Sequence, residues 1–152
     1  MNISKYKDLI QLIKDDFQIS WKGPHGLSHW LRVYKNTQIL SKHYNIESEV
    51  FMLFALLHDS KRENEFEDEF HGLRASIFVK ELIAKKIINL NTLDEKRLLY
   101  ACANHTHSNE DDELFNDKVV EICLDADRLD IGRVGYEVLP YYLKTEYAKS
   151  LC

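Results

Sequence analysis

Val50 to Asp59 reads VFMLFALLHD, eight apolar residues followed directly by a histidine and an aspartate. An apolar run of this length fits a helix that is buried on most sides. His58 and Asp59, at the end of this helix, would then lie inside the hydrophobic core. A buried ionised carboxylate is costly unless it is paired or coordinated. A metal ion that binds both side chains would remove this cost, so we expect further ligands elsewhere in the chain.

Helical patterns account for the rest of the sequence, and alternating strand patterns and internal repeats are absent. The sequence therefore predicts an all-α fold, a compact single-domain bundle of about six to seven helices over residues 1–152. The other predicted helices cover about residues 4–18, 27–44 with Ser28 as cap, 72–88, 92–104 with Thr92 and Glu95 as a capping box, the apolar stretch 119–124, and 141–149.

Composition limits the classes of partner. The formal net charge is −5 and the sequence pI is near 5.8, without a Lys/Arg cluster, so we expect no nucleic acid as main partner. The N-terminus lacks the pattern of a secretory signal, and no apolar run reaches about 20 residues, so we expect no membrane segment and a cytoplasmic protein. Cys102 and Cys123 lie in apolar stretches and are predicted as core residues. A homodimer is possible on the sequence alone.

Polar groups that interrupt apolar faces are the candidate ligands. His43 sits on a polar helix end and is interpreted as a surface residue. Asp125-Ala126-Asp127 follows an apolar run, and one of these two acids should point inward. Helix ends can converge on one point while helix middles form the core, and six histidines lie at helix ends or junctions: His25, His29, His58, His71, His105 and His107.

Three motifs occur in a fixed order between about residues 25 and 135. His29-Trp30-Leu31-Arg32-Val33 has the form H-x-x-R-V, Leu56-Leu57-His58-Asp59 contains the His-Asp dyad, and Asp125 to Asp130 reads DADRLD. With these motifs the chain resembles the HD superfamily of metal-dependent phosphohydrolases. A lone His-Asp dipeptide would be a weak signal, whereas the ordered set at the ends of apolar helical stretches is specific.

The resemblance implies a bundle of the HD-domain type and a bound divalent metal ion. In the family's aspartate motif the ligand follows Ala and precedes a charged residue and Leu, which selects Asp127 over Asp125. Asp125 and Asp130 would then support the ligands or end the helix. The implied metal ligands are His29, His58, Asp59 and Asp127.

Two imidazoles and two carboxylates suit Mn²⁺, Fe²⁺, Co²⁺, Ni²⁺ or Mg²⁺, and the ligand types do not choose among them. Some HD proteins add two histidines and bind a second metal ion, and His71 and His105 occur in the matching order. In the alternative interpretation His71, His105, His107 and His25 line a one-metal pocket and contact phosphate or water. The sequence favours one ion over two, because an acidic loop of undefined geometry separates His71 from the dyad.

The predicted function is that of a phosphohydrolase acting on a nucleotide or another small phosphate ester through a metal-activated water. Arg62 and Arg128 are the nearest candidates to balance the phosphate charge, and Glu63 is the candidate base. Two alternatives remain. One is an HD-type di-iron oxygenase, which requires His71 and His105 to bind a second metal, and the other is a non-enzymatic metal- or nucleotide-binding sensor.

Overall fold

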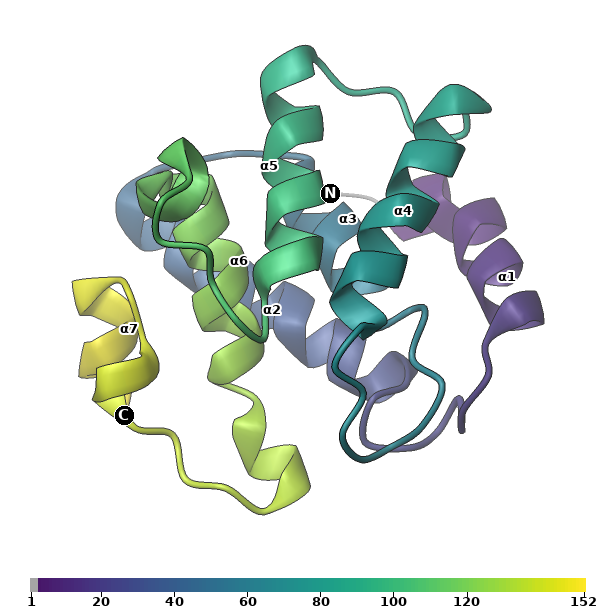
Figure 1. Cartoon of the computed structure of the whole chain (residues 1–152). Helices are drawn as coiled ribbons and strands as arrows, with labels where there is room; N and C mark the ends of the chain where they lie inside the picture. The colour runs from purple at the N-terminus through teal and green to yellow at the C-terminus, as the bar shows by residue number, and fades with distance from the viewer. Residues whose placement is uncertain (1–2) are drawn as a thin grey trace.

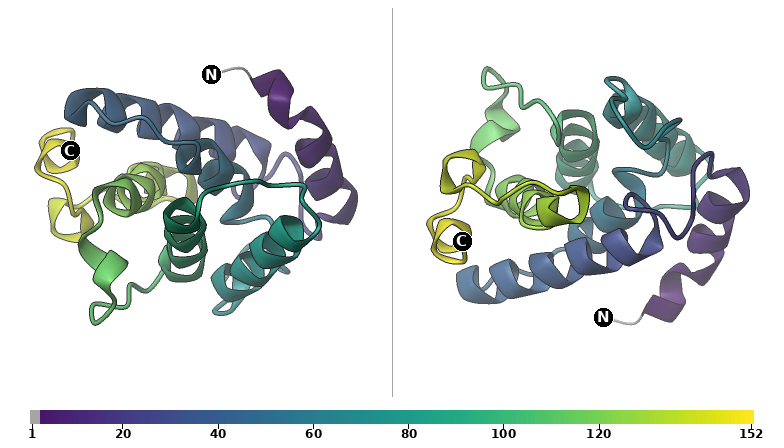
Figure 2. Two further views of the ribbon diagram at one scale, coloured as in Figure 1. Left: turned by 90° about the horizontal axis from the view of Figure 1, so that it is seen from above. Right: turned by 90° about the horizontal axis from the view of Figure 1, so that it is seen from below.

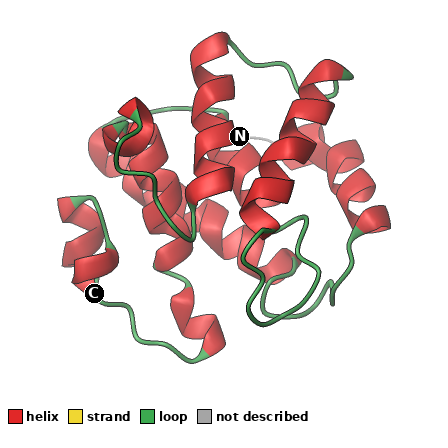
Figure 3. Ribbon diagram, viewed as in Figure 1, coloured by secondary structure: helices red, strands yellow, loops and turns green. Residues whose placement is uncertain are grey.

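The helix α3 (Val50–Leu57) is the centre of the fold, and every one of its side chains is buried. The structure is a computed structural model and describes residues 3–152. Figure 3 shows helices and connecting loops without a strand in these residues, which confirms the all-α prediction. The remaining elements are η1 (Ile3–Tyr6), α1 (Lys7–Asp16), α2 (Leu27–Tyr44), α4 (His71–Ala84), α5 (Thr92–Asn104), η2 (Glu113–Asn116), α6 (Lys118–Arg128), η3 (Ile131–Val134), η4 (Pro140–Tyr142) and α7 (Glu146–Ser150).

The helices α2, α5 and α6 pack against α3. The helix α2 packs against both α3 and α6, and α4 lies along α5 (Figures 1 and 2). Their inward side chains form one hydrophobic core that includes Trp30, Leu40, Val79 and Ile122. Cys102 and Cys123 are free thiols inside this core, as predicted. Among residues 3–152, no helix is both long and apolar enough to cross a membrane.

The predicted bounds 27–44 and 92–104 agree with α2 and α5, but the capping residue of each helix was predicted wrongly. Gly26, not Ser28, is the N-cap of α2, and its carbonyl accepts from the backbone N–H of Trp30. Asn91, not Thr92, caps α5, because its extended backbone lets the side chain accept from the N–H of Asp94 at 2.9 Å. A cap depends on the backbone conformation just before the helix, which the sequence pattern alone did not fix.

Three predicted helices are shorter than expected. The helix predicted over about residues 4–18 is a 3₁₀ turn followed by α1, which ends at Asp16. The helix α4 ends at Ala84, because the backbone of Lys86 turns to a positive φ of 58°. The predicted helix over 141–149 is divided into η4 and α7, because Lys144 and Thr145 turn their backbone N–H groups toward Asp125.

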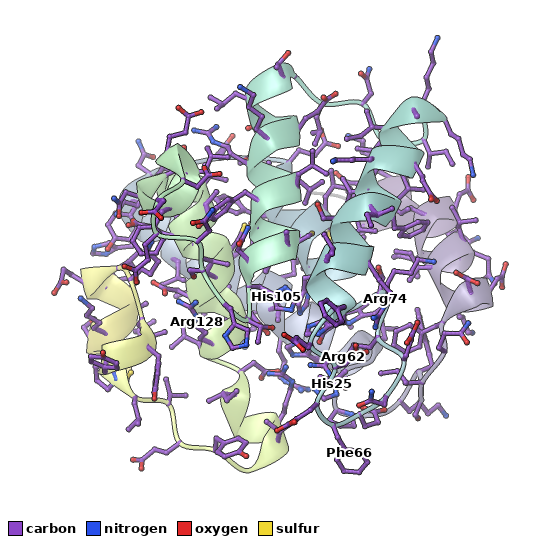
Figure 4. All side chains as sticks on the ribbon, in the orientation of Figure 1. His25, Arg62, Phe66, Arg74, His105 and Arg128 are labelled. Atoms are coloured by element: carbon purple, nitrogen blue, oxygen red, sulfur yellow. The ribbon has the colours of Figure 1, made fainter. Side chains whose placement is uncertain are left out.

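The acidic loop 62–69, whose geometry the sequence left undefined, is tied to the body of the protein. Arg74 donates two hydrogen bonds to the Asp68 carboxylate, at 2.6 and 2.7 Å, and Arg62 donates to the carbonyl of Phe66 at 3.1 Å. Arg62 is buried, whereas the side chain of Phe66 is almost fully exposed and points away from the body in Figure 4. The loop therefore has a fixed inner side and a solvated outer side.

Candidate metal centre

The candidate ligands lie at helix ends, and these ends meet on one side of the bundle. His29 is in the first turn of α2, and Asp127 is in the last turn of α6. His58 and Asp59 follow α3, His71 begins α4, and His105 follows α5. Figure 4 shows His105, Arg62 and His25 gathered below the lower ends of α4 and α5. Because each helix contributes only its end, the helix middles remain free to form the core.

The first ligand group consists of His29, His58 and Asp127 around the Oδ2 atom of Asp59. The Nε2 atom of His29 lies 3.1 Å from Nε2 of His58, 3.5 Å from Asp59 Oδ2 and 3.3 Å from Asp127 Oδ1. The Nε2 atom of His58 lies 3.6 Å from each of these two oxygens. Donor atoms bound to one ion at 2.0 to 2.3 Å lie roughly 2.8 to 3.8 Å apart at octahedral to tetrahedral angles. The observed spacings fit a shared ion.

The second ligand group consists of His71 and His105 around the other carboxylate oxygen of Asp59, Oδ1. Their Nε2 atoms are 2.7 Å apart and lie 3.2 and 3.5 Å from this oxygen. Arg62 donates to the same oxygen from Nε at 3.1 Å. Asp59 therefore faces a different set of imidazoles with each of its two oxygens.

All four imidazoles of the two groups are oriented by a bond at their far nitrogen. An acceptor at Nδ1 fixes the proton there and leaves the lone pair of Nε2 directed at the cluster. Facing lone pairs repel unless a proton or a cation lies between them. The Nδ1 partners are Asp130 Oδ2 at 2.7 Å for His29, the Phe54 carbonyl at 3.0 Å for His58, the Asp68 carbonyl for His71 and the Cys102 carbonyl at 2.8 Å for His105.

Two buried carboxylate oxygens at the cluster, Asp59 Oδ2 and Asp127 Oδ1, have no hydrogen-bond partner among residues 3–152. A buried oxygen without a partner is costly, and a cation is the partner that also satisfies the Nε2 lone pairs. The residues present therefore fit a divalent metal ion. Within residues 3–152, the two groups able to hold an ion both include Asp59.

The electrostatics of the cluster favour positive charge at its centre. Burial lowers the pKa of His29, but its contacts with Asp127, Asp130 and Asp59 outweigh burial and raise that pKa to about 10. Burial also raises the pKa of the Asp59 carboxyl, yet the surrounding histidines, His58 foremost, hold it well below its usual range. The carboxylates are thus ionised at neutral pH. The same field that would hold a proton on His29 attracts a metal cation.

A glycine brings the two histidines of the second ligand group together. A Cβ atom on Gly72 would lie 2.6 Å from the carbonyl oxygen of Cys102 and 3.4 Å from the ring of His105. Only the absence of a side chain lets the start of α4 approach the end of α5 so closely. The contact places His71, the residue before this glycine, against His105.

A pocket of about 830 Å³ opens beside the cluster. Asp59, Asp127 and His105 line its inner end, and the outer wall is mostly apolar, with Tyr136 and Tyr142. Three arginines also line it: Arg62, Arg128 and Arg133. The volume is in the range of pockets that enclose a small organic ligand.

The structure does not bring every predicted site residue to the cluster. Glu63 is exposed, faces Arg74 at 3.5 Å and does not line the pocket. His107 is exposed and also lies outside it. His25 lines the pocket but belongs to neither ligand group. Arg128 lines the pocket while donating to the Tyr142 carbonyl and the Ser108 hydroxyl, at 2.9 and 3.2 Å.

Asp125 and Asp130 have separate supporting contacts. Asp125 is fully buried and accepts from the backbone N–H groups of Lys144 and Thr145, both at 2.8 Å, so it holds the C-terminal segment rather than the cluster. Asp130 accepts from Arg32 at 2.7 Å and faces His29 with its other oxygen. The two acids of the Asp125-Ala126-Asp127 pair are therefore both directed inward, to different places.

Two residues at the site were missed by sequence reasoning. Arg133 lies 3.7 Å from Asp127 Oδ1 and 4.0 Å from Asp59 Oδ2, and it also donates to the Pro24 carbonyl. Glu65, two residues after Glu63, faces the pocket and contacts His25. Arg133 lies in the 3₁₀ turn η3, six residues after Asp127, a spacing without helical periodicity. Nothing in the acidic loop distinguishes Glu65 from its neighbours.

Comparisons with known proteins give one result on the fold. No protein-family model matches the chain, and no curated protein matches it. Among solved structures, the chain is similar to the crystal structure of a predicted HD superfamily hydrolase from an uncultured Thermotogales bacterium. The similarity covers 99% of this chain and 88% of that chain, with 21% identity and a TM-score of 0.69. The protein therefore has the HD-domain fold that its three ordered motifs predicted.

Proposed function

We propose that the protein is a metal-dependent phosphohydrolase that acts on a nucleotide or another small phosphate ester. The observation that carries this proposal is the convergence of four oriented imidazole Nε2 atoms on the Asp59 carboxylate, directly beside a pocket lined by arginines. The structurally similar bacterial protein is itself a predicted hydrolase, which agrees with the proposal.

The geometry supports two divalent cations, in contrast with the preference for one ion drawn from the sequence. His29, His58, Asp59 and Asp127 would hold the first, and Asp59, His71 and His105 the second. When bound, such cations supply Lewis-acid polarisation of a phosphate oxygen and lower the pKa of a water molecule. The ligand types remain compatible with Mn²⁺, Fe²⁺, Co²⁺, Ni²⁺ and Mg²⁺.

The arginines supply the charge that a phosphate requires. Arg133 has a largely buried side chain, and its guanidinium lies near both unpaired carboxylate oxygens. Arg62 is held against Asp59 and turns toward the same end of the pocket. A guanidinium can bind two phosphate oxygens at once. We therefore assign phosphate binding first to Arg133, with Arg62 and Arg128 as further contacts.

The test is a panel of nucleotides and phosphomonoesters assayed with each of the five metals after removal of bound metal by a chelator. We expect phosphate release only when metal is restored. The Arg133→Gln variant should raise KM at least tenfold, because the lost group contacts the phosphate. Lys35→Gln, which removes an exposed charge outside the pocket, is the matched control and should leave KM unchanged.

The six ligands are also those that the di-iron oxygenase alternative requires, so the assay needs an anaerobic arm. A hydrolase retains its activity without oxygen, whereas an oxygenase loses it. Retention of activity only in air, with iron alone, would favour the oxygenase. Tight binding of nucleotides without any turnover would instead favour a binding-only sensor.

A further inference from the structure

We propose that His25 and Glu65 form a proton relay in which His25 is the general base toward the water that attacks phosphorus. This inference rests on the proposed phosphohydrolase function and adds two residues to its chemistry. It starts from an imidazole–carboxylate pair on the pocket wall that takes no part in either ligand group.

The geometry of the pair is that of an oriented base. Nδ1 of His25 lies 2.7 Å from Glu65 Oε2, and the imidazole is almost fully buried. A carboxylate at this distance holds the proton on Nδ1 and leaves the lone pair on Nε2. His25 lines the pocket together with Asp59 and Asp127, so this free nitrogen belongs to the wall beside the cluster. A general base needs a nitrogen of this kind within reach of the reacting water.

The backbone that carries His25 is held at two successive carbonyls. Its carbonyl accepts from the indole N–H of Trp30 at 2.9 Å, and Trp30 packs edge-to-face against Phe17 and Trp21. The neighbouring carbonyl of Pro24 accepts from Arg133 at 3.0 Å. A base that must meet a water molecule precisely gains from such a rigid support.

The carboxylate of Glu65 lies close to the backbone at Gly23. A Cβ atom at Gly23 would lie 2.6 Å from Glu65 Oε1, so the carboxylate occupies space that any other residue at position 23 would fill. That oxygen is buried and has no hydrogen-bond partner in the part of the chain that the structure describes. An ionised carboxylate in this position stabilises the positive charge that His25 acquires when it accepts a proton.

The proton and electron balance of the step is complete. The oxygen of the attacking water forms a bond to phosphorus, and one of its protons passes to His25 Nε2. The bond from phosphorus to the leaving oxygen breaks, and its electron pair stays on that oxygen. The proton on His25 then passes to the leaving group, directly or through water. One water is consumed, and no oxidant or reductant is needed.

The first experiment compares His25→Gln and Glu65→Gln with Glu63→Gln, which lies on the same loop outside the pocket. We expect kcat for p-nitrophenyl phosphate or the best nucleotide to fall about 100-fold in His25→Gln and about tenfold in Glu65→Gln, with KM within about twofold. Glu63→Gln should retain the wild-type kcat. Metal content, measured by elemental analysis, should be unchanged in all three.

The second experiment asks whether an external base can replace His25. His25→Ala removes the imidazole beside the pocket, and added imidazole should restore at least a tenth of the lost kcat, with none restored in Glu65→Ala. A raised KM with unchanged kcat in His25→Gln, a loss of metal in that variant, or no rescue of His25→Ala would each overturn the relay. An inactive wild-type protein with every metal and substrate would instead contradict the proposed function itself.

Discussion

The two ligand groups that share Asp59 are built in different ways. The first group takes one histidine from the start of α2 and an aspartate from the end of α6, elements that are about 100 residues apart in the sequence. The second group takes both histidines from α4 and α5, which are neighbours in sequence and pack side by side. The first group therefore depends on the packing of the whole bundle, and the second on one helix pair.

The outer support of the two groups differs as well. His29 faces a side chain, that of Asp130, at 2.7 Å, whereas both histidines of the second group face backbone carbonyls, those of Asp68 and Cys102. A side-chain support can be removed by one substitution, and a backbone carbonyl cannot. The two groups should thus respond differently to changes outside the ligands.

Asp59→Ala should have the largest effect, because it removes the carboxylate that both groups share. We expect loss of both bound metals and at least a 1000-fold loss of hydrolysis, since neither group then has enough ligands. The far-ultraviolet circular dichroism should keep its helical form, because the ligands lie only at helix ends. Elemental analysis and phosphate release measure the effect. Full metal retention would contradict the assignment of Asp59.

His71→Ala and His105→Ala separate the two groups. Each should lower the metal content from about two to about one and lower kcat about 100-fold, because the remaining donors of the second group cannot hold a divalent ion. His107→Ala, an exposed histidine two residues beyond His105, is the control and should change neither. Unchanged metal content in both variants would restore the one-ion interpretation and exclude the di-iron oxygenase.

Asp130→Asn tests the side-chain support of the first group. We expect the affinity of the first ion to fall 10- to 100-fold, because His29 loses the carboxylate that orients it. The second ion should be retained, since its histidines are oriented by backbone carbonyls. Competition with a chelator, followed by elemental analysis, resolves the two ions. If Asp130→Asn lowered the affinity for both ions equally, the two groups would not differ in how their histidines are supported.

Asp68→Asn should have the smallest effect of these substitutions. It should change only the stability of the loop that supports the second group. The substitution removes charged hydrogen bonds from Arg74 and weakens one from the N–H of Glu63, so we expect a loss of about 1 to 2 kcal/mol in the free energy of unfolding. Metal content should remain unchanged. Glu67→Gln, on the exposed side of the same loop, is the control.

The pH dependence of Asp68→Asn follows from the pKa of this carboxyl. Burial raises that pKa, but the hydrogen bonds from Glu63 and Arg74 outweigh burial and lower it below its usual range. Its contribution to stability is therefore complete above about pH 4, the ordinary Asp pKa, and is lost as the pH falls through the folded-state value. The difference between wild type and variant in denaturant unfolding should shrink from pH 7 to pH 3. If the difference in unfolding free energy stayed constant between pH 7 and pH 3, it would not come from the ionised carboxylate of Asp68.

Much of this protein was determined by local sequence patterns. The apolar run of α3 predicted a buried helix that ends at His58-Asp59, and the all-α class followed from periodicity along the chain. These patterns succeed because a helix repeats every 3.6 residues, so its buried side and its ends can be located from nearby residues alone. The order of the three motifs also indicated the HD-domain fold.

What the sequence left open was decided by contacts between distant segments. The pairing of His71 with His105 depends on how closely α4 approaches α5 at Gly72, and the sequence carries no local signal for that distance. The choice of Glu65 over Glu63 depends on which side of a loop faces the turn at Gly23. Loop side chains have no fixed period, so only tertiary packing determines which of them reach the pocket.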